Sequence, residues 1–198
     1  MKYLKELIVT KKTVFTSDEI KNILSNISPE TLEKSLYRAK QNGDLLNPYK
    51  GIWTLPVYDE KELACKLKKN SYISLESVLY DAGAIFQSYL NTETCVAQST
   101  LDLVINGINY RYNKIKDDLL LNDTFVKQYD DFRIATPERA LCDYVYLFPR
   151  AWIDAPEVFQ SSNSAAKFKK LFPLYPVATQ ETIKKLIDMS DFKVFNYR

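Results

Sequence analysis

The sequence predicts an α+β protein, on the basis of three observations along its 198 residues. Two helix starts lie close together near the N-terminus, and a short hairpin pattern follows them. Between residues 94 and 121, β-branched and aromatic residues dominate, as is typical of strands. Helical patterns then return towards the C-terminus. This order divides the chain into two expected domains, residues 1–56 and residues 57–198.

Two helices are expected before residue 26. The first spans Lys2–Val9, where apolar residues share one face. The second runs from Ser17 to about Ser25, and its start carries a capping box, with Thr16 as the N-cap and Glu19 three residues later.

A third helix and a hairpin complete this part of the chain. The helix is expected from Pro29 to about Asn42, because Ser28 is a favourable N-cap and Gly43 suits the position after the C-cap. The segment "DLLNPYKGIWTLP" then predicts two short strands around "NPYKG". Helix, helix, short turn, helix and hairpin is the order of a winged helix-turn-helix, in which the second helix supports the third in a major groove of DNA. We therefore predict that residues 1–56 form a winged helix-turn-helix DNA-binding domain.

The third helix has a polar face that suits DNA. At 100° per residue, Leu32, Leu36 and Ala39 point inward, and polar residues occupy the opposite side. Side chains there that can contact phosphates or bases are Lys34, Tyr37, Arg38 and Gln41, and the hairpin adds Asn47, Tyr49 and Lys50. Residues 1–56 hold nine basic and six acidic residues, a net charge of +3. The same pattern also fits a protein-binding surface, because Glu30 and Glu33 would repel phosphate.

Residues 57–198 are expected to form an α+β domain with a small, mostly antiparallel sheet. The segment "YISLESVLYDAGA" predicts a helix that Ser74 caps and Gly83 closes. Strands are expected in "TCVAQ", in "LVINGINYRYNKI" with a tight turn at "NG", and in "FRIA". A further helix follows the N-cap Thr136, and two more are expected at about Ser164–Leu171 and about Gln180–Met189.

The composition argues against an enzyme. The chain has no histidine, no Cys-x-x-Cys motif and no glycine-rich phosphate loop, which removes the commonest general base and most zinc sites. We therefore expect no catalytic residue, no cofactor and no metal. Glu138, Arg139 and Asp143 are the polar residues that most suggest catalysis. We interpret Glu138 as an acid at the positive end of a helix, and Arg139 and Asp143 as an i,i+4 pair on the helix surface.

The cysteines and the lengths of the apolar runs predict a cytoplasmic protein without a membrane span. Three distant cysteines suit reduced thiols and a cytoplasmic protein. No apolar run approaches the ~18 residues of a membrane span, so no membrane partner is expected. Charges inside the first apolar run argue against a signal peptide.

Several segments resemble a known family. "YISLESVLYDAG", the strand pair around "NGINYRYNKIK", and "FRIATPERALCDYVYL" resemble the C-terminal domain of the AbiEi-type antitoxins of type IV toxin–antitoxin (abortive infection) systems. The segment from "FTSDEIKNIL" to "GIWTLP" resembles the winged helix that precedes that domain. The resemblance covers nearly the whole chain in the right order, and its most specific parts are "YISLES" and "RIATPERALCD".

This resemblance implies an antitoxin that also binds promoter DNA and represses its own operon. It further implies that the C-terminal domain counteracts a nucleotidyltransferase-like toxin, without need of a stable complex. The basic winged-helix surface of the family corresponds here to Lys34, Arg38 and Lys50, with Lys11 and Lys12 as further phosphate contacts. The full set of expected DNA-binding residues is Lys11, Lys12, Thr16, Ser28, Lys34, Tyr37, Arg38, Gln41, Tyr49 and Lys50.

Two alternatives stay open at this point. In the first, the chain is a protein-binding adaptor that neutralises a partner enzyme by direct contact, without specific DNA binding, and stable co-purification with that partner would support it. In the second, the C-terminal domain is itself an enzyme that uses aspartate and glutamate chemistry. Loss of activity in a folded Asp143→Asn variant would support that reading.

Overall fold

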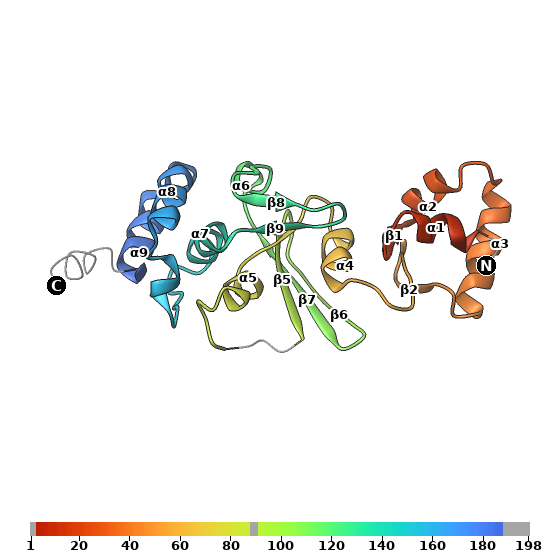
Figure 1. Cartoon of the computed structure of the whole chain (residues 1–198), viewed down its shortest axis with the longest axis horizontal. Coiled ribbons are helices and arrows are strands. Elements are labelled where there is room, and N and C mark those ends of the chain that lie inside the picture. Colours follow the sequence, from red (N-terminus) through yellow and green to blue (C-terminus); the bar gives the residue numbers. More distant parts are fainter. Residues whose placement is uncertain (1–2, 88–90, 188–198) are drawn as a thin grey trace. The chain divides into compact units, whose positions relative to one another are not determined.

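The computed structural model describes residues 3–87 and 91–187 (Figure 1). The chain divides into two compact units. The first comprises Met1–Lys69 together with Asp130–Phe132, and the second comprises Asn70–Tyr129 together with Arg133–Arg198. The protein is therefore of mixed α+β class, as the sequence predicts, with one sheet in each unit.

The described residues of the first unit form four helices and three strands. In chain order these are α1 (Leu4–Val9), β1 (Val14–Thr16), α2 (Ser17–Ile23), α3 (Pro29–Gln41), β2 (Leu46–Tyr49), β3 (Ile52–Thr54) and α4 (Glu60–Leu67). The strands lie in the order β1-β3-β2, and both neighbouring pairs are antiparallel. The three expected helices and the hairpin are all present, although the expected helix start at Lys2 lies outside the described residues.

Side chains next to α2 and α3 fix where these helices begin. Thr16 Oγ1 accepts a hydrogen bond from the Glu19 amide at 3.1 Å, and Glu19 Oε2 accepts one from the Thr16 amide at 2.7 Å, which confirms the capping box. Ser28 Oγ accepts from the Thr31 amide at 3.3 Å, and Pro29 occupies the first helical position. Helix α2 is seven residues long and ends at Ile23, and α3 begins at Pro29 after the short segment 24–28.

The core of the first unit lies between its helices and its sheet. Apolar residues from α1, β1, α2, α3 and the segment before β2 are buried together, and they are Leu7, Phe15, Ile20, Leu24, Leu32, Ala39 and Leu45. Leu32 and Ala39 are buried as the periodicity of the third helix predicts, while Leu36 is partly buried. The opposite side of α3 is thus left to solvent.

Helix α4 belongs to the first unit. Glu62 Oε2 accepts hydrogen bonds from the Thr13 amide at 2.9 Å, the Thr13 hydroxyl at 2.8 Å and the Val14 amide at 2.9 Å. This carboxylate therefore ties α4 to the start of β1. The first unit therefore extends to Lys69, beyond the expected boundary at residue 56.

The described residues of the second unit form a six-stranded sheet and several helices. The elements are β4 (Tyr72–Ile73), α5 (Glu76–Asp81), β5 (Thr92–Ala97), β6 (Leu101–Ile105), β7 (Ile108–Lys114), α6 (Asp117–Leu120), β8 (Val126–Gln128), β9 (Arg133–Ala135), α7 (Pro137–Leu147), η1 (Pro156–Phe159), α8 (Ser162–Leu171), η2 (Phe172–Leu174) and α9 (Val177–Ile187).

This sheet is larger than expected and mixed, which corrects the prediction of a small, mostly antiparallel sheet. Its strands lie in the order β6-β7-β5-β4-β9-β8, and the β5–β7 and β4–β9 pairs are parallel. The β6–β7 hairpin joins the sheet through β7, which pairs with β5 in parallel. The centre of the sheet is β4, a two-residue strand that the sequence pattern did not reveal.

The turn between β6 and β7 forms where the sequence predicts it. Asn106 and Gly107 have φ values of 50° and 82°. Both lie in the left-handed region that a type I′ hairpin turn needs at its two central positions. The strands pair from Ile105↔Ile108 outwards, so the "NG" turn sets the register of the hairpin.

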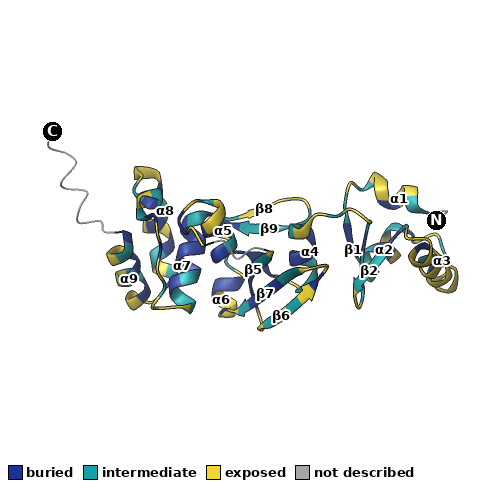
Figure 2. Cartoon of the chain, turned by 90° about the horizontal axis from the view of Figure 1, so that it is seen from below, coloured by how far each residue is buried: buried dark blue, intermediate teal, exposed yellow. Residues whose placement is uncertain are grey.

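The helices of this unit gather around α7. Helix α7 packs against α5, α8 and α9, and Figure 2 shows it as mostly buried. Thr136 caps α7, as expected, through a bond from the Arg139 amide. The expected helices near the C-terminus begin earlier than predicted, at Ser162 and Val177, and the expected end at Met189 lies outside the described residues.

The prediction that Ser74 caps α5 was wrong. The residue before α5 is Leu75, which has a φ of 61° and makes no capping bond with its side chain. The Ser74 hydroxyl is used elsewhere, because it donates to Asp143 Oδ2 at 2.9 Å. Gly83 closes the helix with a φ of 74°, as expected.

Candidate nucleic-acid interface and buried ionic cluster

The exposed side of α3 carries the residues expected to contact DNA. Tyr37 is 64% exposed, and Lys34, Arg38 and Gln41 are exposed as well. The Lys34 ammonium lies 2.6 Å from Glu30 Oε1, so an acid one helical turn away offsets its charge.

A groove runs between α2, α3 and the β2–β3 hairpin. It has a volume of about 980 Å³. Its polar lining comes from Ser17, Lys21, Ser25, Glu33, Tyr37, Lys40 and Asn47, and its apolar lining from Ile27, Pro29, Leu32, Leu36 and Trp53. Tyr37 is the one expected contact residue of α3 that lines this groove.

The groove lining indicates which positive side chains of α3 could contact DNA bound there. Lys40 is three residues from Tyr37, so the two are neighbours on the helix surface, and both line the groove. Lys21 of α2 also lines the groove, and its ammonium lies 3.0 Å from Asp18 Oδ1. Lys34 and Arg38 are exposed on α3 outside the groove lining. Sequence reasoning missed Lys21 and Lys40, because it took the side directly opposite the core as the binding face.

The hairpin is fastened to the start of α2. Asn47 Nδ2 donates to the Tyr49 carbonyl at 3.0 Å and to the Ile52 carbonyl at 2.7 Å, which holds the turn in shape. Trp53 Nε1 donates to Ser17 Oγ at 3.2 Å, so the second strand of the hairpin is tied to α2. The exposed residues Tyr49 and Lys50 stand at the turn of the hairpin.

The remaining expected contact residues lie near the helix starts. Lys11 is exposed and has a φ of 62°. The Lys12 ammonium lies 2.6 Å from Asp131 Oδ1, and the hydrogen bond to Asp131 raises the pKa of Lys12 despite its partial burial. The hydroxyls of Thr16 and Ser28 are engaged in capping. Lys11 is therefore the most available of these four for a phosphate.

A fully buried ionic cluster occupies the second unit. Arg139 and Asp143 are 0% exposed, and Arg139 Nε lies 3.2 Å from Asp143 Oδ1. The remaining N–H groups of Arg139 donate to Tyr72 Oη at 2.8 Å and to the carbonyls of Leu119, Asn122 and Thr124 at 2.6, 3.2 and 3.2 Å. All five guanidinium N–H groups are thus used. The prediction that this pair lies on the helix surface was wrong.

The carboxylate of Asp143 is equally satisfied. Oδ1 accepts from Tyr175 Oη at 2.6 Å, and Oδ2 accepts from Tyr72 Oη and Ser74 Oγ, each at 2.9 Å. Burial raises the pKa of Asp143, while Arg139 and the three hydroxyl donors act against this shift. Burial works against the charge of Arg139, yet Asp143 and the two tyrosines raise its pKa overall. The cluster leaves no donor or acceptor open to a substrate, which favours a structural role.

The cluster joins the two segments that carry the family resemblance. "YISLES" covers β4 and the start of α5, and "RIATPERALCD" covers β9 and most of α7. Ile73 of β4 pairs with Ile134 of β9, and Asp143 is the last residue of the second segment. Tyr72 and Ser74 of the first segment bind that aspartate. The most specific motifs of the chain therefore meet at a packing site.

Glu138 is part of a second ionic contact. Its Oε1 accepts from Ser164 Oγ at 2.8 Å and lies 3.0 Å from Lys167 Nζ. Burial alone would raise the pKa of Glu138, but the bonds from Lys167 and Ser164 lower it below its usual value. Lys167 therefore anchors α8 to α7.

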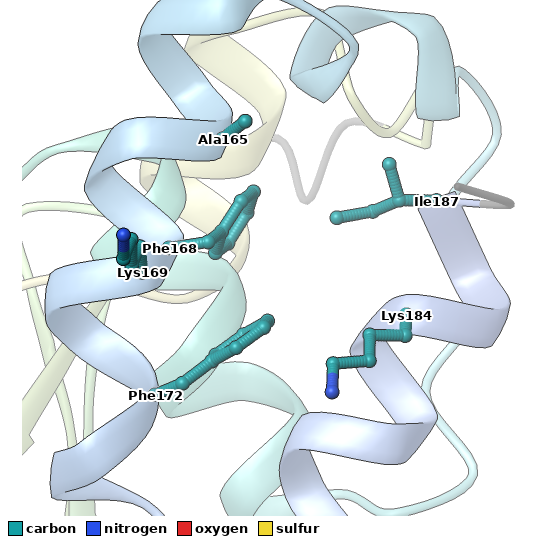
Figure 3. A pocket seen from close by; sticks show the side chains of 6 residues that line it. All are labelled: Ala165, Phe168, Lys169, Phe172, Lys184 and Ile187. Atoms are coloured by element: carbon teal, nitrogen blue, oxygen red, sulfur yellow. The ribbon is translucent and has the colours of Figure 1, made fainter. Parts of the chain in front are cut away.

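A small cavity lies between α8 and α9 (Figure 3). It has a volume of about 190 Å³. Phe168, Phe172 and Ile187 wall it, and Lys169 and Lys184 stand on either side, with Lys184 Nζ 5.5 Å from the centre of the Phe172 ring. Both lysines belong to the last turns of their helices, where a positive charge offsets the helix dipole.

The described part of the chain contains no group of three or more acidic residues or cysteines placed to hold a metal ion. Within the same part, none of the helices is both long and apolar enough to span a bilayer.

Comparison with known proteins gives a fold relation alone. Neither a protein-family model nor a curated protein sequence matches the chain. The crystal structure of the RV2827C protein from Mycobacterium tuberculosis is similar to it, with a TM-score of 0.56 over 93% of this chain and 74% of that chain. The two sequences are 12% identical, so the similarity concerns the fold.

Proposed function

We propose that the chain is an antitoxin that also regulates transcription by binding promoter DNA through a winged helix in its first unit. The observation that carries the DNA-binding part is the groove between α2, α3 and the β2–β3 hairpin, which is lined by Lys21, Tyr37 and Lys40. In this proposal α3 enters a major groove, and the hairpin, with Tyr49 and Lys50 at its turn, holds the backbone beside it. The antitoxin part rests on the family resemblance of both units.

The side of α3 that faces DNA can be tested with two charge-matched double variants. Lys21→Ala with Lys40→Ala removes the groove cations, and Lys34→Ala with Arg38→Ala removes the same net charge outside the groove. Each pair lowers the net charge by two, so a difference between them reports geometry rather than total charge. The assay is a gel-shift titration on the DNA upstream of the gene, with scrambled DNA of equal length as competitor.

The groove pair is expected to have the larger effect. Each lost phosphate contact lowers the slope of log affinity against log salt by about 0.9, so the groove variant should lose close to two units of slope. The Lys34 and Arg38 variant should keep most of its affinity. A larger loss in that second variant would place DNA on the outer side of α3, as the sequence alone predicts.

The apolar floor of the groove supports a second candidate. Ile27, Leu36 and Trp53 line it, and side chains of this kind suit a protein segment. In that case the chain is an adaptor that neutralises a partner enzyme by contact. The wild-type protein would then shift its own upstream DNA no more than scrambled DNA, and it would co-purify with the product of a neighbouring gene.

A further inference from the structure

A further pocket lies where α7 ends and the chain turns towards η1. It has a volume of about 570 Å³, within the range of small-molecule sites. Aromatic side chains line much of it, and Trp152 is 72% exposed, with Phe148 also exposed. The Tyr144 ring packs edge-on against Phe148 at 5.5 Å between centres, which supports one of these rings from behind. Exposed rings beside a pocket offer stacking surfaces for a flat ligand.

The pocket also contains a buried carboxyl group. Glu76, in the first turn of α5, lines the pocket and is buried. Its Oε2 has no hydrogen-bond partner among the described residues. Burial raises the pKa of Glu76, and Arg111 and Thr94 offset only part of that shift. A buried acceptor without a partner is costly, so a ligand N–H group would be favoured here.

The charge at the rim decides what kind of ligand fits. Arg150 lines the same pocket and is exposed. The aromatic rings and the carboxyl group of this pocket would by themselves suit a cation. The positive side chain of Arg150 at the entrance would repel an ammonium group, however. The same guanidinium is well suited to a phosphate, which it can bind through two N–H groups.

We propose that this pocket binds a nucleotide, with the base stacked on Trp152 and Phe148, an N–H of the base directed to Glu76, and the phosphate on Arg150. The nucleotide is either free or an unpaired residue of a single-stranded RNA, because both present the same base and phosphate. This site is separate from the groove of the first unit and does not depend on DNA binding there.

Tryptophan fluorescence of the full chain tests the proposal directly. The two tryptophans are Trp53 and Trp152, so the difference between the wild type and Trp152→Phe isolates the signal of the pocket. GMP and AMP should quench the wild type saturably and leave Trp152→Phe unchanged. Ribose 5-phosphate, which lacks a base, should not quench.

Variants separate the roles of the charged groups. Arg150→Gln should weaken GMP binding about tenfold, equal to about 1.4 kcal/mol, and leave guanosine unaffected. Glu76→Gln replaces one carboxyl oxygen with an NH2 donor, so it should weaken GMP and guanosine by the same factor. Lys170→Gln removes a positive charge from an exposed position of α8 outside the pocket and should change nothing.

The source of the nucleotide follows from a further titration with a short single-stranded RNA that carries a 5′-phosphate. Tighter binding of the RNA than of GMP would identify RNA as the source, and the reverse would identify a free nucleotide. Absence of saturable quenching by any nucleotide or by the RNA would overturn the proposal. Quenching by tetramethylammonium without quenching by GMP would also overturn it, in favour of a cation site.

Discussion

Replacing Asp143 with asparagine should strongly destabilise the second unit. Asparagine keeps the size of the side chain but removes its charge, and its amide would face hydroxyls that now donate to a carboxylate. Arg139 would then stay buried at 0% exposure without a counter-ion. Removing one partner of a buried ion pair costs about 3–5 kcal/mol, a large part of the 5–15 kcal/mol that typically stabilises a domain.

The chain contains a matched control for this experiment. Asp102 and Arg111 are joined by the same atoms at 3.3 Å, compared with 3.2 Å in the buried pair, but these side chains are 62% and 38% exposed. Asp102→Asn should therefore cost about 0–1 kcal/mol. The two variants remove the same charge from an arginine partner, but Asp143 is buried and also accepts bonds from three hydroxyl groups.

The measurement is a urea titration followed by circular dichroism and by fluorescence. Trp53 lies in the first unit and Trp152 in the second, so Trp53→Phe and Trp152→Phe backgrounds leave one tryptophan to report each unit. With an m-value of about 2 kcal/mol/M, the midpoint reported by Trp152 should fall by about 2 M in the Asp143 variant. A midpoint no lower than that of Asp102→Asn would refute the view that the buried pair stabilises this unit.

Three further changes have expected outcomes. Lowering the pH below 4.5 should reduce the free energy of unfolding, because the Glu138 carboxylate, whose pKa is lowered in the folded state, loses its contact with Lys167 when it takes up a proton. Glu138→Gln has no charge to lose at this position, so its free energy of unfolding should fall less over the same pH range in urea titrations. Gly107→Ala places a side chain at a φ of 82° and should cost about 1 kcal/mol or more, measured by thermal unfolding; an unchanged melting temperature would show that the turn relaxes. Thr16→Ala removes the bond to the Glu19 amide and should lower the stability of the first unit by about 0.5–2 kcal/mol, read from the Trp53 emission, whereas no change would mean that water replaces the cap.

Features that depend on nearby residues could be predicted from the sequence. The caps at Thr16, Ser28 and Thr136 bind amides three residues along the chain, and the Asn106–Gly107 turn is set by its own two residues. Features that depend on distant residues could not be predicted. Strand β4 has too few residues to show a pattern, and its parallel pairing with β9 joins separate parts of the chain.

The same distinction applies to the candidate sites. The i,i+4 spacing of Arg139 and Asp143 is identical on a surface and in a core, and burial here is decided by Tyr72 and Tyr175, which lie far away in sequence. On α3, the periodicity identified the buried side correctly but not the groove. Whether Lys40 or Arg38 belongs to the groove depends on where α2 and the hairpin lie, and no pattern within the helix contains that information.

The short central strand β4 has a consequence for how the protein folds as it is synthesised. Tyr72 and Ile73 leave the ribosome early, but one of their two neighbouring strands, β9, follows much later in the chain. Pairings between such distant segments form slowly, and nascent chains fold from the N-terminus as domains are completed. The edge of β4 that pairs with β9 therefore stays unpaired until β9 has been synthesised. We expect this interval to be the period in which the nascent chain is most prone to aggregate and to depend on chaperones.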